Sequence, residues 1–97
     1  MKENIYIIWK RKKKEYDHCG KLIFEGENLN GETNGKGKEY DFNGELIFEG
    51  LYLNGKKNGI IKEYINGILI FEAEYEKGKR KQTIKLYYNG RVVYERK

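Results

Sequence analysis

The only histidine, His18, stands directly before the only cysteine, Cys19, and these residue types are common in nucleophilic and metal sites. A Cys–His nucleophile needs contact between the two side chains beside an oxyanion-binding site, and a zinc site needs three or four ligands. Neighbouring side chains on a strand point to opposite faces. In a turn they could meet, but this pair occupies the position that Phe42 and Asn43 hold in a later, similar segment. The sequence therefore predicts an exposed turn here.

Carboxylates and glycines also recur in patterns that are found in some catalytic and phosphate-binding sites. Three carboxylates recur at one period: Glu25, Glu49 and Glu72. An active site is usually singular, so a periodic acid is interpreted as a solvated or cross-strand pairing position. The glycines at 31, 35 and 37 lack the following Lys-Ser/Thr of a P-loop, and a serine triad is excluded because the chain has no serine. We expect no enzymatic activity, no cofactor and no metal.

Length and composition predict one domain over 1–97. Aromatic and β-branched residues are too frequent for a disordered chain. The net charge of +5 permits attraction to nucleic acid, anionic lipid or an acidic protein, and it selects none of them. One cysteine excludes an internal disulfide and fits a reducing compartment. We expect a cytoplasmic protein, with peripheral attachment to a membrane as an alternative.

A repeated pentapeptide organises the chain. Leu-Ile-Phe-Glu-Gly occurs at 22–26 and 46–50, and an altered copy occurs at 69–73. Repeats aligned on it span 20–43, 44–66 and 67–89, and a terminal strand follows at 90–97. Residues 1–19 are expected to form a partial N-terminal repeat or cap, because KEYDHC at 14–19 matches KEYDFN at 38–43.

Each repeat contains two apolar/polar alternating runs, which indicate strands. Asn-Gly sequences separate these runs and are the strongest local signal of a hairpin. The predicted fold is all-β: an elongated, single-layer antiparallel meander built from about three to four hairpin repeats.

The spacing of the pentapeptide, 24 and then 23 residues, predicts two kinds of connection between hairpins. A two-residue turn after the second repeat puts Tyr64 opposite Leu69. A three-residue turn at 42–44 with a glycine bulge puts Tyr40 opposite Leu46. The register is thereby kept despite the unequal spacing.

Strict alternation from this register predicts two different faces. One carries an aromatic ladder: Tyr16, Phe24, Tyr40, Phe48, Tyr64, Phe71, Tyr87 and Tyr94. The flanking positions of this face are Leu22, Leu46, Leu69 and Val92, with small residues at Gly26, Gly50 and Ala73 that leave room for rings. The other face carries Ile23, Ile47, Ile70 and Val93, alternating with Glu25, Glu49, Glu72 and Glu95.

An exposed apolar surface of this kind usually marks an interface. The ladder is therefore predicted to bind another protein or a second copy of the chain. In the alternative, the tyrosines and leucines only pack against one another on a curled sheet.

Basic residues gather in a run at 10–14 and around the turns within the hairpins. The predicted basic edge comprises Lys10, Arg11, Lys12, Lys56, Lys57, Lys79, Arg80 and Lys81. Binding to an anionic phospholipid membrane through this edge is the alternative function. Lysines at a sheet edge also discourage aggregation, which is the simpler interpretation. Nucleic acid is disfavoured, because the aromatic spacing fits a structural ladder better than a base-stacking platform.

Residues 14–97 resemble the MORN repeat, whose core reads roughly Y-x-G-x-W-x-x-G-x-x-x-G-x-G, and are most similar to its bacterial-type variant. The first repeat matches with Phe24, Gly26, Asn28, Gly31, Gly35 and Gly37. The second matches with Phe48, Gly50, Tyr52, Gly55 and Gly59, and has Ile61 at the last glycine position. The third keeps Phe71, Tyr75 and Gly78, but has Ala73, Gln82 and Ile84 at glycine positions. No repeat has tryptophan at the W position.

The resemblance implies a single-layer antiparallel sheet and non-catalytic roles. These are scaffolding, protein contacts, dimerisation and, in some members, association with phospholipid membranes. An antitoxin-like role is a special case of protein binding that the same resemblance implies.

Overall fold

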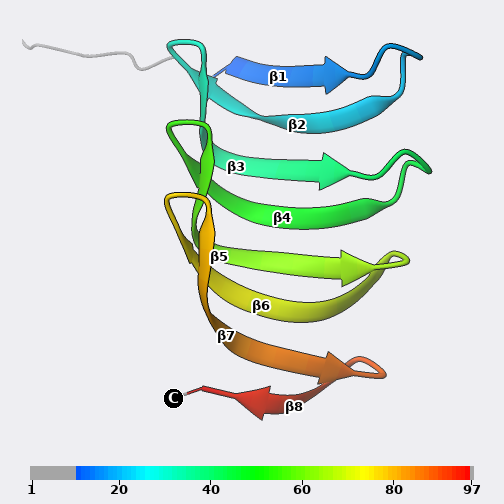
Figure 1. The fold of residues 1–97 in the computed structure, drawn as a ribbon, viewed down its shortest axis with the longest axis vertical. Coiled ribbons are helices and arrows are strands. Elements are labelled where there is room, and N and C mark those ends of the chain that lie inside the picture. The colour runs from blue at the N-terminus through cyan, green and yellow to red at the C-terminus, as the bar shows by residue number, and fades with distance from the viewer. Residues whose placement is uncertain (1–10, 97) are drawn as a thin grey trace, which may run out of the picture.

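The computed structural model describes residues 11–96, and these residues form one open eight-stranded antiparallel sheet in the order β1 to β8 (Figure 1). The strands are β1 (Arg11–Tyr16), β2 (Leu22–Leu29), β3 (Glu32–Tyr40), β4 (Leu46–Leu53), β5 (Lys56–Ile65), β6 (Ile68–Glu76), β7 (Lys79–Tyr88) and β8 (Arg91–Glu95). The prediction of an all-β, single-layer meander is confirmed. Within these residues, no helix is long and apolar enough to span a bilayer.

The turns within the hairpins use left-handed backbone conformations. Asn54 and Gly55 have φ of 52° and 81°, as a two-residue turn between right-twisted strands requires. The third repeat has Lys77 at the asparagine position, and Lys77 and Gly78 still adopt φ of 52° and 86°. The turn of the third repeat therefore keeps the geometry of the second, although a lysine replaces the asparagine that is favoured at its first position.

Both predicted connections between hairpins are confirmed. The 42–44 turn is closed by the N–H of Asp41, which donates to the Glu45 carbonyl at 2.9 Å, and Gly44 takes φ of 84°. Tyr40 then pairs with Leu46, and in the next junction Tyr64 pairs with Leu69.

The prediction that all eight ladder residues share one face is wrong, because a one-residue bulge follows the leucine or valine that pairs with each ladder tyrosine. Tyr40 pairs with Leu46 but Glu39 pairs with Phe48, so Ile47 is an extra residue between them. The same shift occurs at Ile23, Ile70 and Val93. An extra residue reverses the alternation of side chains beyond it, and each phenylalanine therefore lies on the face opposite to the neighbouring tyrosine.

The two faces are named here by their most regular residues. The Phe face carries Phe24, Phe48, Phe71 and Tyr94, together with Tyr52, Tyr75, Glu39 and Glu63. The Lys–Glu face carries Lys14, Lys38, Lys62 and Lys85 with Glu25, Glu49, Glu72 and Glu95, and also Tyr16, Tyr40, Tyr64, Tyr87, Leu22, Leu46, Leu69 and Val92. Ile23, expected beside the glutamates, lines a hollow with Phe24 instead.

The small core lies on the Phe face. Ile61 and Ala73 are fully buried, Tyr75 is 9% exposed, and Phe48 packs against them. The strands curve near the turns within the hairpins, at the left of Figure 1. This curvature lets a one-layer sheet bury side chains on one of its faces.

Two glycines make room for rings on the Phe face. This was predicted for Gly26, whereas a Cβ atom at Gly50 would meet the Ile60 carbonyl and Ile61 first. A Cβ atom at Gly26 would lie 2.9 Å from Cζ of Phe24, and one at Gly37 would lie 2.7 Å from Cδ1 of Tyr52. The rings therefore lie directly over bare backbone, which a larger residue would block.

Candidate functional site

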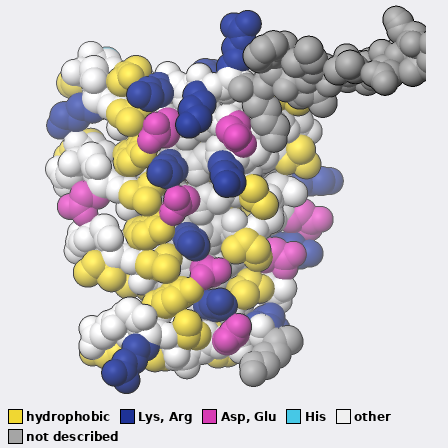
Figure 2. All heavy atoms as spheres, turned by 180° about the vertical axis from the view of Figure 1, so that it is seen from behind, with side chains coloured by type: hydrophobic (Ala, Val, Ile, Leu, Met, Phe, Trp, Pro, Cys, Tyr) yellow, Lys and Arg dark blue, Asp and Glu magenta, His cyan; other side chains and the backbone are white. Residues whose placement is uncertain are grey.

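A row of alternating lysines and glutamates crosses the whole sheet on the Lys–Glu face. Successive partners from β1 to β8 are Lys14, Glu25, Lys38, Glu49, Lys62, Glu72, Lys85 and Glu95. Figure 2 shows basic and acidic side chains interleaved down this face, with apolar side chains beside them. Lys38 Nζ lies 3.9 Å from Glu49 Oε2. The row has four lysines and four glutamates, so its net charge is zero.

Tyrosine hydroxyls fix the orientation of three of the four glutamates in this row. Tyr40 donates to Glu25 and Tyr87 donates to Glu72. The third bond joins Tyr64 Oη to Glu49 Oε1 at 2.8 Å. Each bond joins the two strands of one hairpin, so every repeat holds its carboxylate in the same way.

These contacts change the acidity of the tyrosines. Burial, and then the hydrogen bond to a carboxylate, raise the pKa of Tyr40 and of Tyr64 to about 12. For Tyr87 the bond to Glu72 is the larger cause, and its pKa is also raised to about 12. The neutral phenols therefore persist as donors well above the ordinary tyrosine pKa of 10.0.

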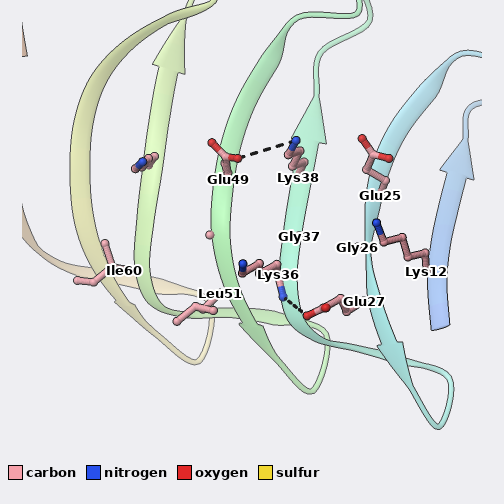
Figure 3. A pocket seen from close by; sticks show the side chains of 12 residues that line it. Lys12, Glu25, Gly26, Glu27, Lys36, Gly37, Lys38, Glu49, Leu51 and Ile60 are labelled. Atoms are coloured by element: carbon pink, nitrogen blue, oxygen red, sulfur yellow. Dashed lines mark hydrogen bonds and ion pairs between the residues drawn. The ribbon is translucent and has the colours of Figure 1, made fainter. Parts of the chain in front are cut away.

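A shallow groove runs beside the charged row, over the backbone of Gly26, Gly37 and Gly50 (Figure 3). One wall is the part of the Lys–Glu row formed by Glu25, Lys38, Glu49 and Lys62. The other wall carries Leu51 and Ile60, which are 46% and 41% exposed, together with Lys12, Glu27 and Lys36. The groove thus combines fixed charges of both signs with exposed aliphatic side chains.

The Phe face holds charged groups that serve its own packing. Lys57 Nζ lies 4.2 Å from the centre of the Phe48 ring and 3.1 Å from Glu39 Oε2. Arg80 lies over Phe71 in the next repeat and pairs with Glu63. A cation over a ring beside a carboxylate is a self-contained arrangement, so these two basic residues are structural.

The same carboxylates accept from the two buried tyrosines. Tyr52 donates to Glu39, and Tyr75 Oη donates to Glu63 Oε2 at 2.9 Å. Burial first, and then these hydrogen bonds, raise the pKa of both tyrosines. Sequence reasoning did not assign Tyr52 or Tyr75 to this cluster, although their repeat spacing of 23 residues was a usable signal.

The predicted aromatic ladder is therefore two half-ladders. Its tyrosines Tyr16, Tyr40, Tyr64 and Tyr87 lie on the Lys–Glu face, whereas Phe24, Phe48, Phe71 and Tyr94 lie on the Phe face. Phe48 belongs to the packed core, while Tyr16 and Tyr94 on the outer strands are 56% and 45% exposed. The eight ladder rings, all within the described residues, therefore form no continuous surface for a partner.

The predicted basic edge is only partly assembled. The turns within the hairpins do lie along one edge, and Arg11 of β1 reaches it opposite Asn28. Lys57 and Arg80 are engaged on the Phe face, and Lys81 pairs with Glu76 at 3.5 Å. Lys12 instead lines the groove on the Lys–Glu face. Lys56 and Lys79 remain exposed beside the turns, and Lys10 lies outside the described residues.

His18 and Cys19 lie in the exposed turn between β1 and β2. The N–H of Cys19 donates to Asp17 Oδ1 at 2.8 Å, which is local turn chemistry. Among residues 11–96, no group of three or more His, Cys, Asp or Glu side chains could hold a metal ion.

The Lys–Glu row was not predicted as a site. Its lysines recur every 24 or 23 residues, like the glutamates, and this period was readable from the sequence. The bulge was not predicted, and it is the bulge that brings the lysines, the glutamates and the tyrosines to one face.

Residues 56–92, which run from β5 into β8, match a family described as a domain of unknown function (DUF4368). The match covers fewer than half of the residues. Searches of curated proteins and of solved structures found no match to the chain.

Proposed function

We propose that this protein is a non-enzymatic, MORN-type repeat module that binds another protein through its Lys–Glu face. The observation that carries the proposal is the balanced row of fixed charges beside exposed aliphatic side chains. Protein interfaces combine an apolar centre with a polar surround, and Leu51 and Ile60 next to Lys38 and Glu49 supply both within one groove.

Charge balance favours a protein over a polyanion as the partner. Lysines and glutamates alternate about 4.8 Å apart across neighbouring strands, which is shorter than the screening length of about 10 Å. Their fields therefore largely cancel at the distance of a phosphate-bearing surface. At contact distance the same row presents positive and negative charges in a specific order, which a complementary protein surface can match.

Attachment to an anionic membrane is the less supported alternative. Lys57, Arg80 and Lys81 of the predicted edge are neutralised by nearby carboxylates, so they add little attraction. Liposome co-sedimentation at low and high salt tests this alternative. Salt-sensitive pelleting with acidic but not neutral lipid would favour it over the protein-binding proposal. A cytoplasmic location is part of the protein-binding proposal, and peripheral membrane contact belongs only to the alternative.

The test starts from a tagged full chain, with its partner purified and then titrated directly by calorimetry. Leu51→Ser with Ile60→Ser should weaken binding at least tenfold, which is about 1.4 kcal/mol, because both side chains wall the groove. Ile65→Ser with Ile68→Ser is the matched control. These two residues are 56% and 58% exposed and pair at the 66–67 turn on the other face. Equal losses in both variants, or none in the first, would contradict the proposal.

A further inference from the structure

The two outer strands, β1 and β8, each have a single neighbouring strand among residues 11–96. Such edges present unpaired backbone N–H and C=O groups, which can pair with a strand of another chain. The side chains on these two edges decide which strand can pair with them.

The Lys–Glu row has opposite charges at its two ends. It begins with Lys14 on β1 and finishes with Glu95 on β8. Each inner glutamate lies between two lysines, as Glu25 lies between Lys14 and Lys38. Glu95 has only Lys85 beside it in the described sheet. The β1 edge therefore offers a lysine, Lys14, and the β8 edge has a glutamate, Glu95, that lacks a lysine on its outer side.

The tyrosine hydrogen bonds show the same difference between the two edges. The carboxylates of the first three glutamates each accept from a tyrosine on the following strand: Tyr40, Tyr64 and Tyr87. Tyr16 occupies the equivalent place on β1 and is 56% exposed. Within residues 11–96, no strand follows β8 to supply such a tyrosine to Glu95.

We propose that copies of this chain associate head to tail, with β8 of one copy pairing with β1 of the next. Glu95 then lies opposite Lys14 of the next copy, and Tyr16 of that copy donates to Glu95. Neither Lys14 nor Glu95 lines the groove of the proposed function, so the inference goes beyond that function and does not rest on it.

The geometry of the sheet permits this continuation. The sheet has eight strands in strict antiparallel order, so β1 of a second copy, translated along the sheet, runs antiparallel to β8 with the same face outward. Glu95 and Lys14 share the Lys–Glu face. Tyr94 meets Glu15 on the Phe face, just as Phe24 meets Glu39 inside the chain. One register therefore satisfies both faces.

Symmetric pairings of like edges fit less well. Two β1 strands would bring together the consecutive basic residues at 11–14, and like charges on paired strands are unfavourable. Two β8 strands could match Arg91 with Glu95 in sequence, but the bulge at Val93 puts these residues on opposite faces. Head-to-tail pairing does not close on itself, so it predicts short linear chains of variable length.

One contact in the proposed register is unfavourable and limits its strength. Lys13 would lie opposite Arg96 of the preceding copy. Within its own copy, Lys13 pairs with Glu15 at 3.4 Å, and the N–H of Arg96 donates to the Ile84 carbonyl. The overlap of two short strands is also small, so the association should be weak and dependent on concentration.

The experiment is sedimentation velocity of the full chain over a range of concentrations at low salt. Wild type should show an average mass that rises with concentration. Lys14→Glu alone and Glu95→Lys alone should each weaken association roughly tenfold, because an attractive cross-strand pair becomes repulsive. The Lys14→Glu/Glu95→Lys double variant should regain association, and so should an equimolar mixture of the two single variants.

The double variant controls for folding, since it carries both substitutions. As a second readout, Tyr16→Phe should weaken association severalfold, while Tyr88→Phe, whose ring is 69% exposed on the Phe face, should not. A monomer at all concentrations overturns the inference. So does association that Glu95→Lys leaves intact, or a double variant that stays dissociated. The groove variant Leu51→Ser/Ile60→Ser should still associate, so the two proposals can fail separately.

Discussion

The bond from Tyr64 to Glu49 shows how a single residue pair supports both shape and surface. It joins β5 to β4 at 2.8 Å and holds the glutamate in the charged row. A hydrogen bond to a charged acceptor contributes about 1.5–3 kcal/mol to stability, more than an exposed ion pair does. The tyrosines that were predicted to contact a partner therefore also order the charges beside them.

The raised pKa values predict a specific alkaline transition. Folded Tyr40, Tyr64 and Tyr87 hold their protons to about pH 12, whereas an unfolded tyrosine loses its proton near pH 10.0. The folded state binds these protons more tightly, so their contribution to stability is complete below pH 10 and is lost as pH rises to about 12. Circular dichroism and tyrosinate absorbance, followed together against pH, should change in that window. Unfolding completed well below pH 10 would contradict the assignment.

The core is small enough that one side chain should dominate it. Ile61 is fully buried on the Phe face, and Ile61→Ala should cost about 2–5 kcal/mol of unfolding free energy. Its neighbour Ile60 is 41% exposed on the other face. Ile60→Ala is therefore a matched control, and it should lower the unfolding free energy by less than about 1 kcal/mol. Urea titration measures both. Equal costs would mean that the assignment of the two faces is wrong.

At the scale of elements, the hairpins could be predicted from sequence and the bulges could not. Asn-Gly at 66–67 and the longer connection at 42–44 each indicate a turn of known geometry, and both pairings that followed were confirmed. Nothing local distinguishes Ile47 from an ordinary strand residue, since isoleucine suits a bulge and a regular strand alike. A single bulge reverses a face, and the ladder prediction therefore failed although its strands were correct.

The third repeat shows how strand pairing changes where a glycine of the second repeat is replaced. In the second repeat Gly59 has φ of 111°, which absorbs the irregular pairing between Gly50 and Tyr52. Gln82 stands at the corresponding position, and there the pairing of β6 with β7 shifts at two separate places instead. A side chain other than glycine disfavours that φ, so the distortion is divided between two smaller bulges.

The turn at 77–78 offers a stabilising substitution. Lys77 has φ of 52°, a conformation that asparagine adopts severalfold more readily than lysine. Lys77→Asn should raise the unfolding free energy by roughly 0.5–1 kcal/mol. The reciprocal Asn54→Lys should lower it by a similar amount, because Asn54 has the same φ of 52°. Thermal unfolding of both variants checks this, and a change of the same sign in both would contradict the explanation.

At the scale of the whole molecule, a one-layer sheet must leave most of its side chains near solvent. Among residues 11–96 only a few are buried in the core, so each face is a surface that a partner can reach. The net charge of +5 could suggest a polyanion as partner, but the charges on the Lys–Glu face alternate and cancel. The arrangement of charge, and not its sum, is what favours recognition of a protein.

The most direct test of protein binding through the Lys–Glu face is to map the contact by NMR. The purified partner is titrated into isotope-labelled full chain while backbone and methyl signals are followed. We expect the largest shift changes at Lys38, Glu49, Leu51 and Ile60 around the groove, with the methyls of Ile65 and Ile68 nearly unchanged. Changes confined to the Phe face, or to the turns that carry Lys56 and Lys79, would contradict the proposed site.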